Sequence, residues 1–216
     1  MLYSEHTECD KLTQLKKLLE ESQFIKSKLE NNKDLLEYLS LHTGWSISSI
    51  VQLEGLYDTL LTEEFFNKTL PHWTDAVFPG GQFGQLRNLF FLLGSFDLQM
   101  KRLQAGPFLS ELVSHFDAVR EGAMLPTARK MFMYAAHDTT ISYVLNTLGI
   151  YDGLAPPFTS MVIIELYYLD AEYRVKISYR NDTNTQPQVL TIPGCHQLCP
   201  LQLLVDVSSG VVVGGG

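Results

Sequence analysis

A histidine followed directly by an aspartate, His137-Asp138, is the pair of side chains in this sequence best suited to chemistry. The residues before the pair are mostly apolar, which predicts a buried strand over Lys130–Ala136. The residues after it are amphipathic and predict a helix over Asp138–Leu148. The strand end and the first helical turn would then place amides, an imidazole and a carboxylic acid around an anion. Such a pair suits the chemistry of phosphate esters.

A plainer interpretation of the pair must be weighed against this one. Aspartate is a good N-cap, and a histidine at the end of a strand is usually just solvated. From the local sequence alone, Asp138 and His137 are therefore more often a capped helix start than a site. Sequence further along the chain is needed to decide between the two interpretations.

Composition limits the class of function. The 216 residues are 45% hydrophobic, which is enough for one ordinary core or two small ones. A net charge of −8 argues against nucleic-acid binding and against an anionic membrane surface, because both need a basic face. No apolar run approaches the roughly 18 residues that a membrane span requires. The opening residues 1–9 carry early charges and no apolar stretch, so they do not predict a signal peptide.

Two acceptor sequons nevertheless suggest the secretory pathway. Asn67 begins Asn-Lys-Thr and Asn181 begins Asn-Asp-Thr, each in a stretch that is typical of a loop. We therefore predict glycosylation at Asn67 and Asn181.

The three cysteines also favour an oxidising compartment. Cys195 and Cys199 lie in a short segment rich in turn formers, where a disulfide would lock a turn and add little chain entropy. A metal site made from these two cysteines and His196 is the poorer alternative, because no second ligand cluster accompanies it. Cys9 is left over, which suggests a partner outside this chain.

The chain divides into a helical part and a mixed part. Residues 9–122 predict almost only helices, interrupted at glycines and prolines. Residues 123–216 predict the strand and helix around His137, then a hairpin of Met161–Leu169 and Tyr173–Tyr179, and a short helix after Pro200. The organisation is that of an α/β layer with a helical cap attached.

Seven segments, in a fixed order, form a pattern that extends over roughly residues 9–205. They are residues 67–73, 101–107, 133–140, 151–158, 164–167, 179–183 and 190–201, and they include the His-Asp-Thr-Thr tetrapeptide and a Pro-Gly-Cys-His-Gln-Leu-Cys-Pro loop. In these segments and their order, the chain resembles the C-terminal part of the histidine acid phosphatase family, of the prostatic and lysosomal type.

The resemblance implies a mechanism. In this family a histidine of an Arg-His-Gly motif attacks phosphorus, arginines surround the phosphoryl oxygens, and neither a metal nor another cofactor is required. His137 would donate a hydrogen bond to a phosphoryl oxygen and so stabilise the transition state. Asp138 would protonate the departing alkoxide, a general-acid role that favours an acidic working pH. The substrates would be phosphate monoesters, the location secreted or lysosomal, and the assembly a homodimer.

The nucleophilic half of this mechanism has no match in the chain. None of the six histidines follows an arginine or precedes a glycine. Cys9 matches a family cysteine whose partner lies beyond the last residue here, and Met161 occupies one position of a further family pair. We therefore expect an incomplete doubly wound, histidine phosphatase-like sheet with a large all-helical cap, truncated at both ends.

Two functions from different classes follow from this expectation. The first is an acid phosphatase working through a phosphohistidine intermediate, of which this chain is a part that is inactive alone. The second is a catalytically inactive short form that binds phosphorylated ligands or partner subunits.

Overall fold

The computed structural model describes residues 9–212, so the prediction for the opening residues 1–8 lies outside it. The chain forms two compact units, Cys9–Leu93 and the part from Gly94 onward. The predicted domain boundary after residue 122 follows a change in sequence character, not compactness, and stays a prediction.

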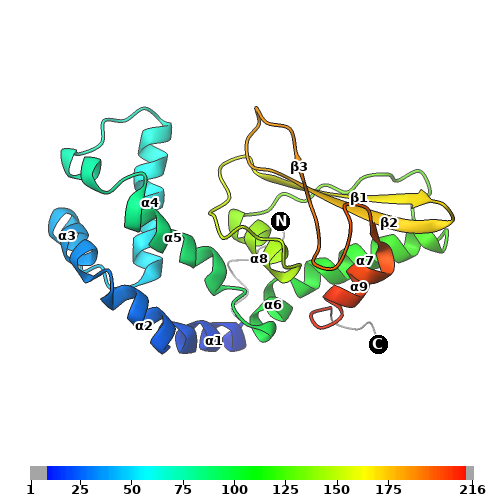
Figure 1. Cartoon of the computed structure of the whole chain (residues 1–216), viewed down its shortest axis with the longest axis horizontal. Coiled ribbons are helices and arrows are strands. Elements are labelled where there is room, and N and C mark those ends of the chain that lie inside the picture. Colours follow the sequence, from blue (N-terminus) through cyan, green and yellow to red (C-terminus); the bar gives the residue numbers. More distant parts are fainter. Residues whose placement is uncertain (1–8, 213–216) are drawn as a thin grey trace. The chain divides into compact units, whose positions relative to one another are not determined.

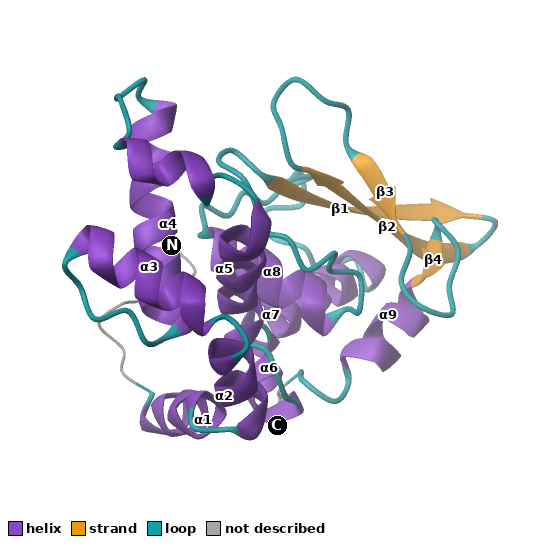
Figure 2. Cartoon of the chain, turned by 60° about the vertical axis from the view of Figure 1, so that its left-hand side comes forward, coloured by secondary structure: helices purple, strands orange, loops and turns teal. Residues whose placement is uncertain are grey.

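The first unit is helical, as Figure 2 shows in purple. Serine side chains cap two of its helices: Ser22 accepts a hydrogen bond from the Ile25 amide, and Ser49 accepts one from the Gln52 amide. Its helices are α1 (Asp10–Glu20), α2 (Gln23–Glu30), α3 (Lys33–Thr43), α4 (Ile50–Phe65) and α5 (Gly81–Leu93), with a 3-10 turn, η1, over His72–Ala76.

The second unit combines helices with a small antiparallel sheet (Figure 1). Its helices are α6 (Leu98–Gln104), α7 (Gly106–Arg120), α8 (Asp138–Thr147) and α9 (Leu201–Ser208). Its strands are β1 (Met161–Leu169), β2 (Glu172–Arg180), β3 (Gln188–Leu190) and β4 (Cys199–Pro200). No helix within residues 9–212 has both the length and the apolar character needed to cross a bilayer.

The β1–β2 hairpin organises the sheet, and its prediction from period-2 alternation is confirmed. The two strands pair from Met161 opposite Arg180 to Leu169 opposite Glu172. Asp170 and Ala171 form the turn with φ of 52° and 61°. Positive φ values at both positions are typical of two-residue turns that match the right-handed twist of the flanking strands. β3 and β4 both pair with β2, so β2 is the central strand.

The core of this unit lies on one face of the sheet. Val175 and Ile177 of β2 are almost fully buried and pack with Leu109 of α7, Val144 of α8 and Leu204 of α9. Figure 1 shows α7 and α9 beneath the sheet accordingly. α8 is therefore fixed to the same apolar core as the sheet.

The predicted strand over Lys130–Ala136 is wrong for this structure. The residues run extended from α7 to α8 but pair with no strand, and Figure 2 draws them as loop. Met131 and Met133 are 70% and 84% exposed, so the segment is not buried either. A strand needs a neighbouring strand to complete its backbone hydrogen bonds. Among the described residues, strands pair in the antiparallel sheet around β2, and residues 130–136 do not join that sheet. The predicted helix after it is confirmed as α8.

Candidate functional site

His137 and Asp138 lie where the sequence placed them, at the N-terminus of α8. His137 is the extended N-cap residue, with φ −102° and ψ 163°, and its amide donates to Thr140 Oγ1 at 3.4 Å. Asp138 begins the helix, and its Oδ1 accepts the Thr139 amide hydrogen at 2.7 Å. Asp138 is exposed, and its second carboxylate oxygen has no hydrogen-bond partner among residues 9–212. The His137 side chain and the Thr140 amide complete a capping box, so the pair borders solvent at a first helical turn whose amides at Thr139 and Thr140 already have partners.

Close packing fixes α8 behind this pair. Tyr143 is buried and lies so near Gly94 that a Cβ at that glycine would come within 2.1 Å of the ring. One turn further, the Asn146 side chain donates to both the carbonyl and the hydroxyl of buried Ser95, each at 2.9 Å. The helix that presents the pair therefore has a defined position relative to residues 94–95.

A polar cluster that sequence reasoning missed holds the segment before the pair. The Tyr134 hydroxyl donates to Glu111 Oε1 at 2.9 Å, and His115 Nε2 lies 3.1 Å from the same hydroxyl. Glu111 and His115 are one turn apart on α7, and His115 Nε2 lies 3.3 Å from Glu111 Oε1. The four-residue spacing of Glu111 and His115 is visible in the sequence, but it does not indicate that Tyr134 joins them.

The electrostatics of the cluster keep Tyr134 protonated. Burial and the hydrogen bond to Glu111, in that order, raise the pKa of Tyr134 to about 12. The phenol therefore stays a donor throughout the acidic and neutral range.

The disulfide between Cys195 and Cys199 is present, with Cα atoms 5.5 Å apart. Because both sulfurs are bonded to each other, the alternative metal site with His196 is excluded in this structure. Cys199 is buried and pairs with Val175 of β2, so the bridge ties a loop to the central strand. Cys9 is a free thiol just before α1. Across the described residues, no three metal-ligating side chains are grouped.

Both sequons have exposed asparagines. Asn67 follows α4 with φ 55°, and Asn181 follows the last residue of β2. Either side chain is accessible for modification, and glycosylation at both stays a prediction.

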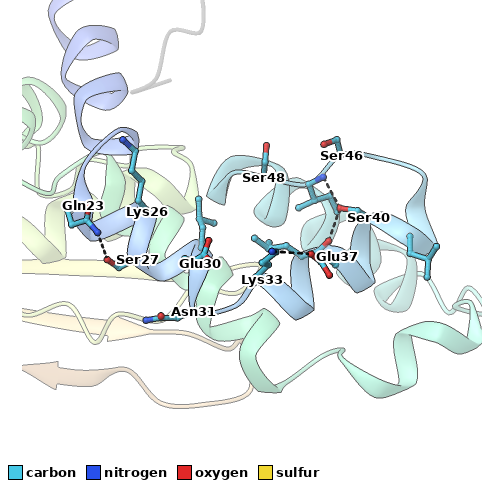
Figure 3. Close-up of a pocket in the computed structure, with 14 residues that line it drawn as sticks. Gln23, Lys26, Ser27, Glu30, Asn31, Lys33, Glu37, Ser40, Ser46 and Ser48 are labelled. Carbon is cyan, nitrogen blue, oxygen red and sulfur yellow. Dashed lines mark hydrogen bonds and ion pairs between the residues drawn. The ribbon is translucent and has the colours of Figure 1, made fainter.

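The helical unit holds an open groove along α2 and α3 (Figure 3). Its charged rim has both signs: Lys33 is 3.7 Å from Glu37, and Lys26 and Glu30 also line it. Such a mixed lining does not favour a phosphate ester, so we do not assign the groove to the chemistry of His137.

Comparison with known proteins decides the family. The family model of the histidine phosphatase superfamily (branch 2) matches residues 4–180, which include His137 and Asp138. The chain belongs to this superfamily. It is a histidine acid phosphatase relative that combines helices with an antiparallel sheet.

Individual relatives agree with this assignment. The chain is 33% identical to prostatic acid phosphatase of Bos taurus over 98% of its own length and 55% of the relative's. It is 31% identical to lysosomal acid phosphatase of Rattus norvegicus over 84% of its length and 43% of the relative's. It is 29% identical to venom acid phosphatase Acph-1 of Apis mellifera, over 79% of its own length and 44% of the relative's. The histidine phosphatase chain thus spans about half the length of the curated relatives it matches.

Proposed function

We propose that this chain carries the proton-donating half of an acid phosphatase site that acts on phosphate monoesters through a phosphohistidine. His137 donates a hydrogen bond to a phosphoryl oxygen and stabilises the charge of the transferring group. Asp138 protonates the leaving alkoxide. Neither role calls for a metal or an organic cofactor.

The observation that supports this proposal is the position of the pair within a family match. Asp138 offers a carboxylate oxygen without a partner among residues 9–212, next to the amides of a helix start. A phosphoryl group at this place would lie at the positive end of α8, and the aspartate would face its ester oxygen.

The nucleophile has to come from elsewhere, because no Arg-His-Gly tripeptide occurs in the 216 residues. We propose that an additional segment carries it and pairs with residues 130–136, which would then become a strand of a doubly wound sheet. Residues 9–122 would form the helical cap of that longer fold, and residues 123–216 the C-terminal part of its α/β domain.

The same missing tripeptide favours a second candidate function. The chain on its own would bind phosphorylated ligands or partner subunits without turnover, because the covalent step has no nucleophile.

Assay of the 216-residue chain with an aryl phosphate at acidic pH tests the point that both candidates share, the absence of a nucleophile in this chain. We expect no hydrolysis above the uncatalysed background, with weak binding of inorganic phosphate by ³¹P NMR. A trapped phosphohistidine, or robust turnover, would show that the chain holds its own nucleophile and would overturn the proposal for the separate chain.

A longer protein that includes the Arg-His-Gly motif tests the role of Asp138. Asp138→Asn should slow hydrolysis of alkyl phosphates, which have poor leaving groups, by about 10²–10⁴-fold, and slow aryl phosphates less. Asp206→Asn, an exposed aspartate on α9, is the matched control and should leave both rates unchanged. Equal slowing of both substrate types by Asp138→Asn would argue against a general acid.

The secretory location and a homodimeric state belong to the same proposal. Relatives named prostatic and lysosomal acid phosphatase support the location, together with the exposed sequons at Asn67 and Asn181. A mass decrease on treatment of the natural protein with an N-glycanase tests the glycans, and analytical ultracentrifugation tests the dimer.

A further inference from the structure

Residues 129–137, the arm, lead from α7 to the site without the support of a sheet. Their outward side chains Met131 and Met133 are 70% and 84% exposed. The inward side chains, Phe132 and Tyr134, are half-buried against α7. Side-chain contacts therefore replace the ladder hydrogen bonds that would otherwise hold an extended segment in place.

Stacked rings supply the first set of these contacts. The His115 ring lies on Phe132 with centroids 3.8 Å apart and planes 15° apart. The Phe108 ring meets Tyr134 nearly edge-on, at 5.2 Å and 86°. The Arg129 guanidinium lies 5.2 Å from the Phe132 centroid. Aromatic pairs at these separations contribute stabilisation in addition to the burial of apolar area, and they oppose sliding of the arm along α7.

Hydrogen bonds supply the second set and fix the direction of the arm. Glu111 accepts from the Tyr134 hydroxyl, and His115 Nε2 lies within reach of both oxygens. The three groups, which we call the Tyr134 clasp, attach one residue of the arm to two successive turns of α7. Burial and the hydrogen bond to Glu111 raise the pKa of Tyr134 to about 12, so its hydroxyl remains a donor at acidic and neutral pH.

The clasp lies close to the proposed chemistry. Tyr134 precedes His137 by three residues, and three extended residues span about 10 Å. Beyond that stretch α8 is fixed by Tyr143 and Asn146, so the clasp and the helix fix the two ends of a short tether. His137 is the junction between them.

From this arrangement we propose that Glu111, His115 and Tyr134 are positioning residues, which hold the arm on α7 so that His137 and Asp138 face the substrate in a fixed orientation. The statement that these residues serve a substrate site rests on the proposed function. The attachment of the arm to α7 does not depend on it. None of the three side chains is assigned a direct contact with the phosphoryl group.

¹⁵N relaxation of the full 216-residue chain tests the holding. Tyr134→Phe keeps the ring contact with Phe108 and deletes the hydroxyl. We expect the backbone order parameters of residues 130–137 to fall, because the arm loses a hydrogen bond that holds it on α7. Tyr168→Phe, which removes the hydroxyl of an exposed tyrosine on β1, is the matched control and should leave the arm unchanged. Unchanged order parameters in the arm of Tyr134→Phe would overturn the clasp.

Conservative replacement separates positioning from simple packing. Glu111→Gln keeps an acceptor oxygen and should restore most of the backbone order that the arm loses in Glu111→Ala, while the order parameters within α7 stay constant and report an intact fold. Tyrosine ¹³Cζ NMR gives a spectroscopic signature: Glu111→Gln should lower the pKa of Tyr134 from about 12 toward its usual 10. A titration that does not move would contradict the hydrogen bond.

The His137 ring reports whether the clasp reaches the site. Its NMR chemical shifts should change in Tyr134→Phe and not in Tyr168→Phe. If they stay constant while the order parameters of the arm fall, the clasp holds the arm but does not position His137, and the proposal fails. Because no readout here uses turnover, a failure of the phosphatase proposal would leave these results interpretable.

Discussion

Two extended stretches of the same unit, the arm and the β1–β2 hairpin, have different structures although the sequence predicted strands in both. The hairpin finds its partner across a two-residue turn, pairs over nine positions and buries Val175 and Ile177. The arm finds no strand and is held on α7 by Phe132 and Tyr134. A segment that favours an extended chain thus becomes a strand only where a partner lies within reach.

One charged substitution in each stretch gives the largest expected contrast. Ile177→Lys buries an ammonium in the core beneath the sheet and should unfold this unit or cost more than about 3 kcal/mol. Met133→Lys changes an outward, 84% exposed side chain and should stay within about 0.5 kcal/mol of the parent. Urea unfolding followed by circular dichroism measures both. Similar costs for the two variants would mean that the outward face of the arm is covered in solution.

A smaller effect is expected where α8 meets residue 94. Gly94→Ala places a methyl group within 2.1 Å of the Tyr143 ring and should destabilise the chain by about 1–3 kcal/mol, because the ring is buried and cannot move freely. Gly55→Ala on α4 is the control: nothing lies within 4 Å of its Cβ, so it should be neutral or stabilising. If thermal unfolding gave the same midpoint for both variants, the contact that locates α8 would be in doubt.

The smallest effect concerns an exposed pair on the hairpin. Lys176 Nζ lies 2.9 Å from Glu165 Oε2, and hydrogen bonds from Lys176 and then Tyr167 hold the pKa of Glu165 below its usual 4.5. The stabilisation is therefore complete well above pH 4.5 and is lost as the pH falls below it. The effect should be small, because water screens a pair that is about one-third exposed. Urea unfolding of Glu165→Gln should show a deficit at pH 7 that shrinks at pH 3.5; a deficit that grows on acidification would reverse the assignment.

Local patterns in the sequence predicted the parts that local contacts make. The hairpin, α8 and the Cys195–Cys199 bridge all join residues that are near in sequence. The position of His137 and Asp138 at the helix start followed from the same patterns. Their roles came from the family resemblance, since geometry alone does not separate a general acid from a helix cap.

The parts that sequence reasoning missed depend on distant residues. Tyr134 meets Glu111 across 23 positions, and Asn146 meets Ser95 across 51. The strand predicted at residues 130–136 required a neighbour that the described chain does not supply. In each case the missing information was which segments meet in space, and no periodicity carries that information.

The bridge between Cys195 and Cys199 has a practical consequence for handling the protein. A covalent ring closed over so few residues restricts the unfolded chain little, so most of the folding free energy comes from the apolar core. A chain produced in a reducing cytosol should therefore reach its native sheet with both thiols free. Since Cys199 lies in β4 beside Val175, oxidation afterwards would join two sulfurs that the fold has already brought together.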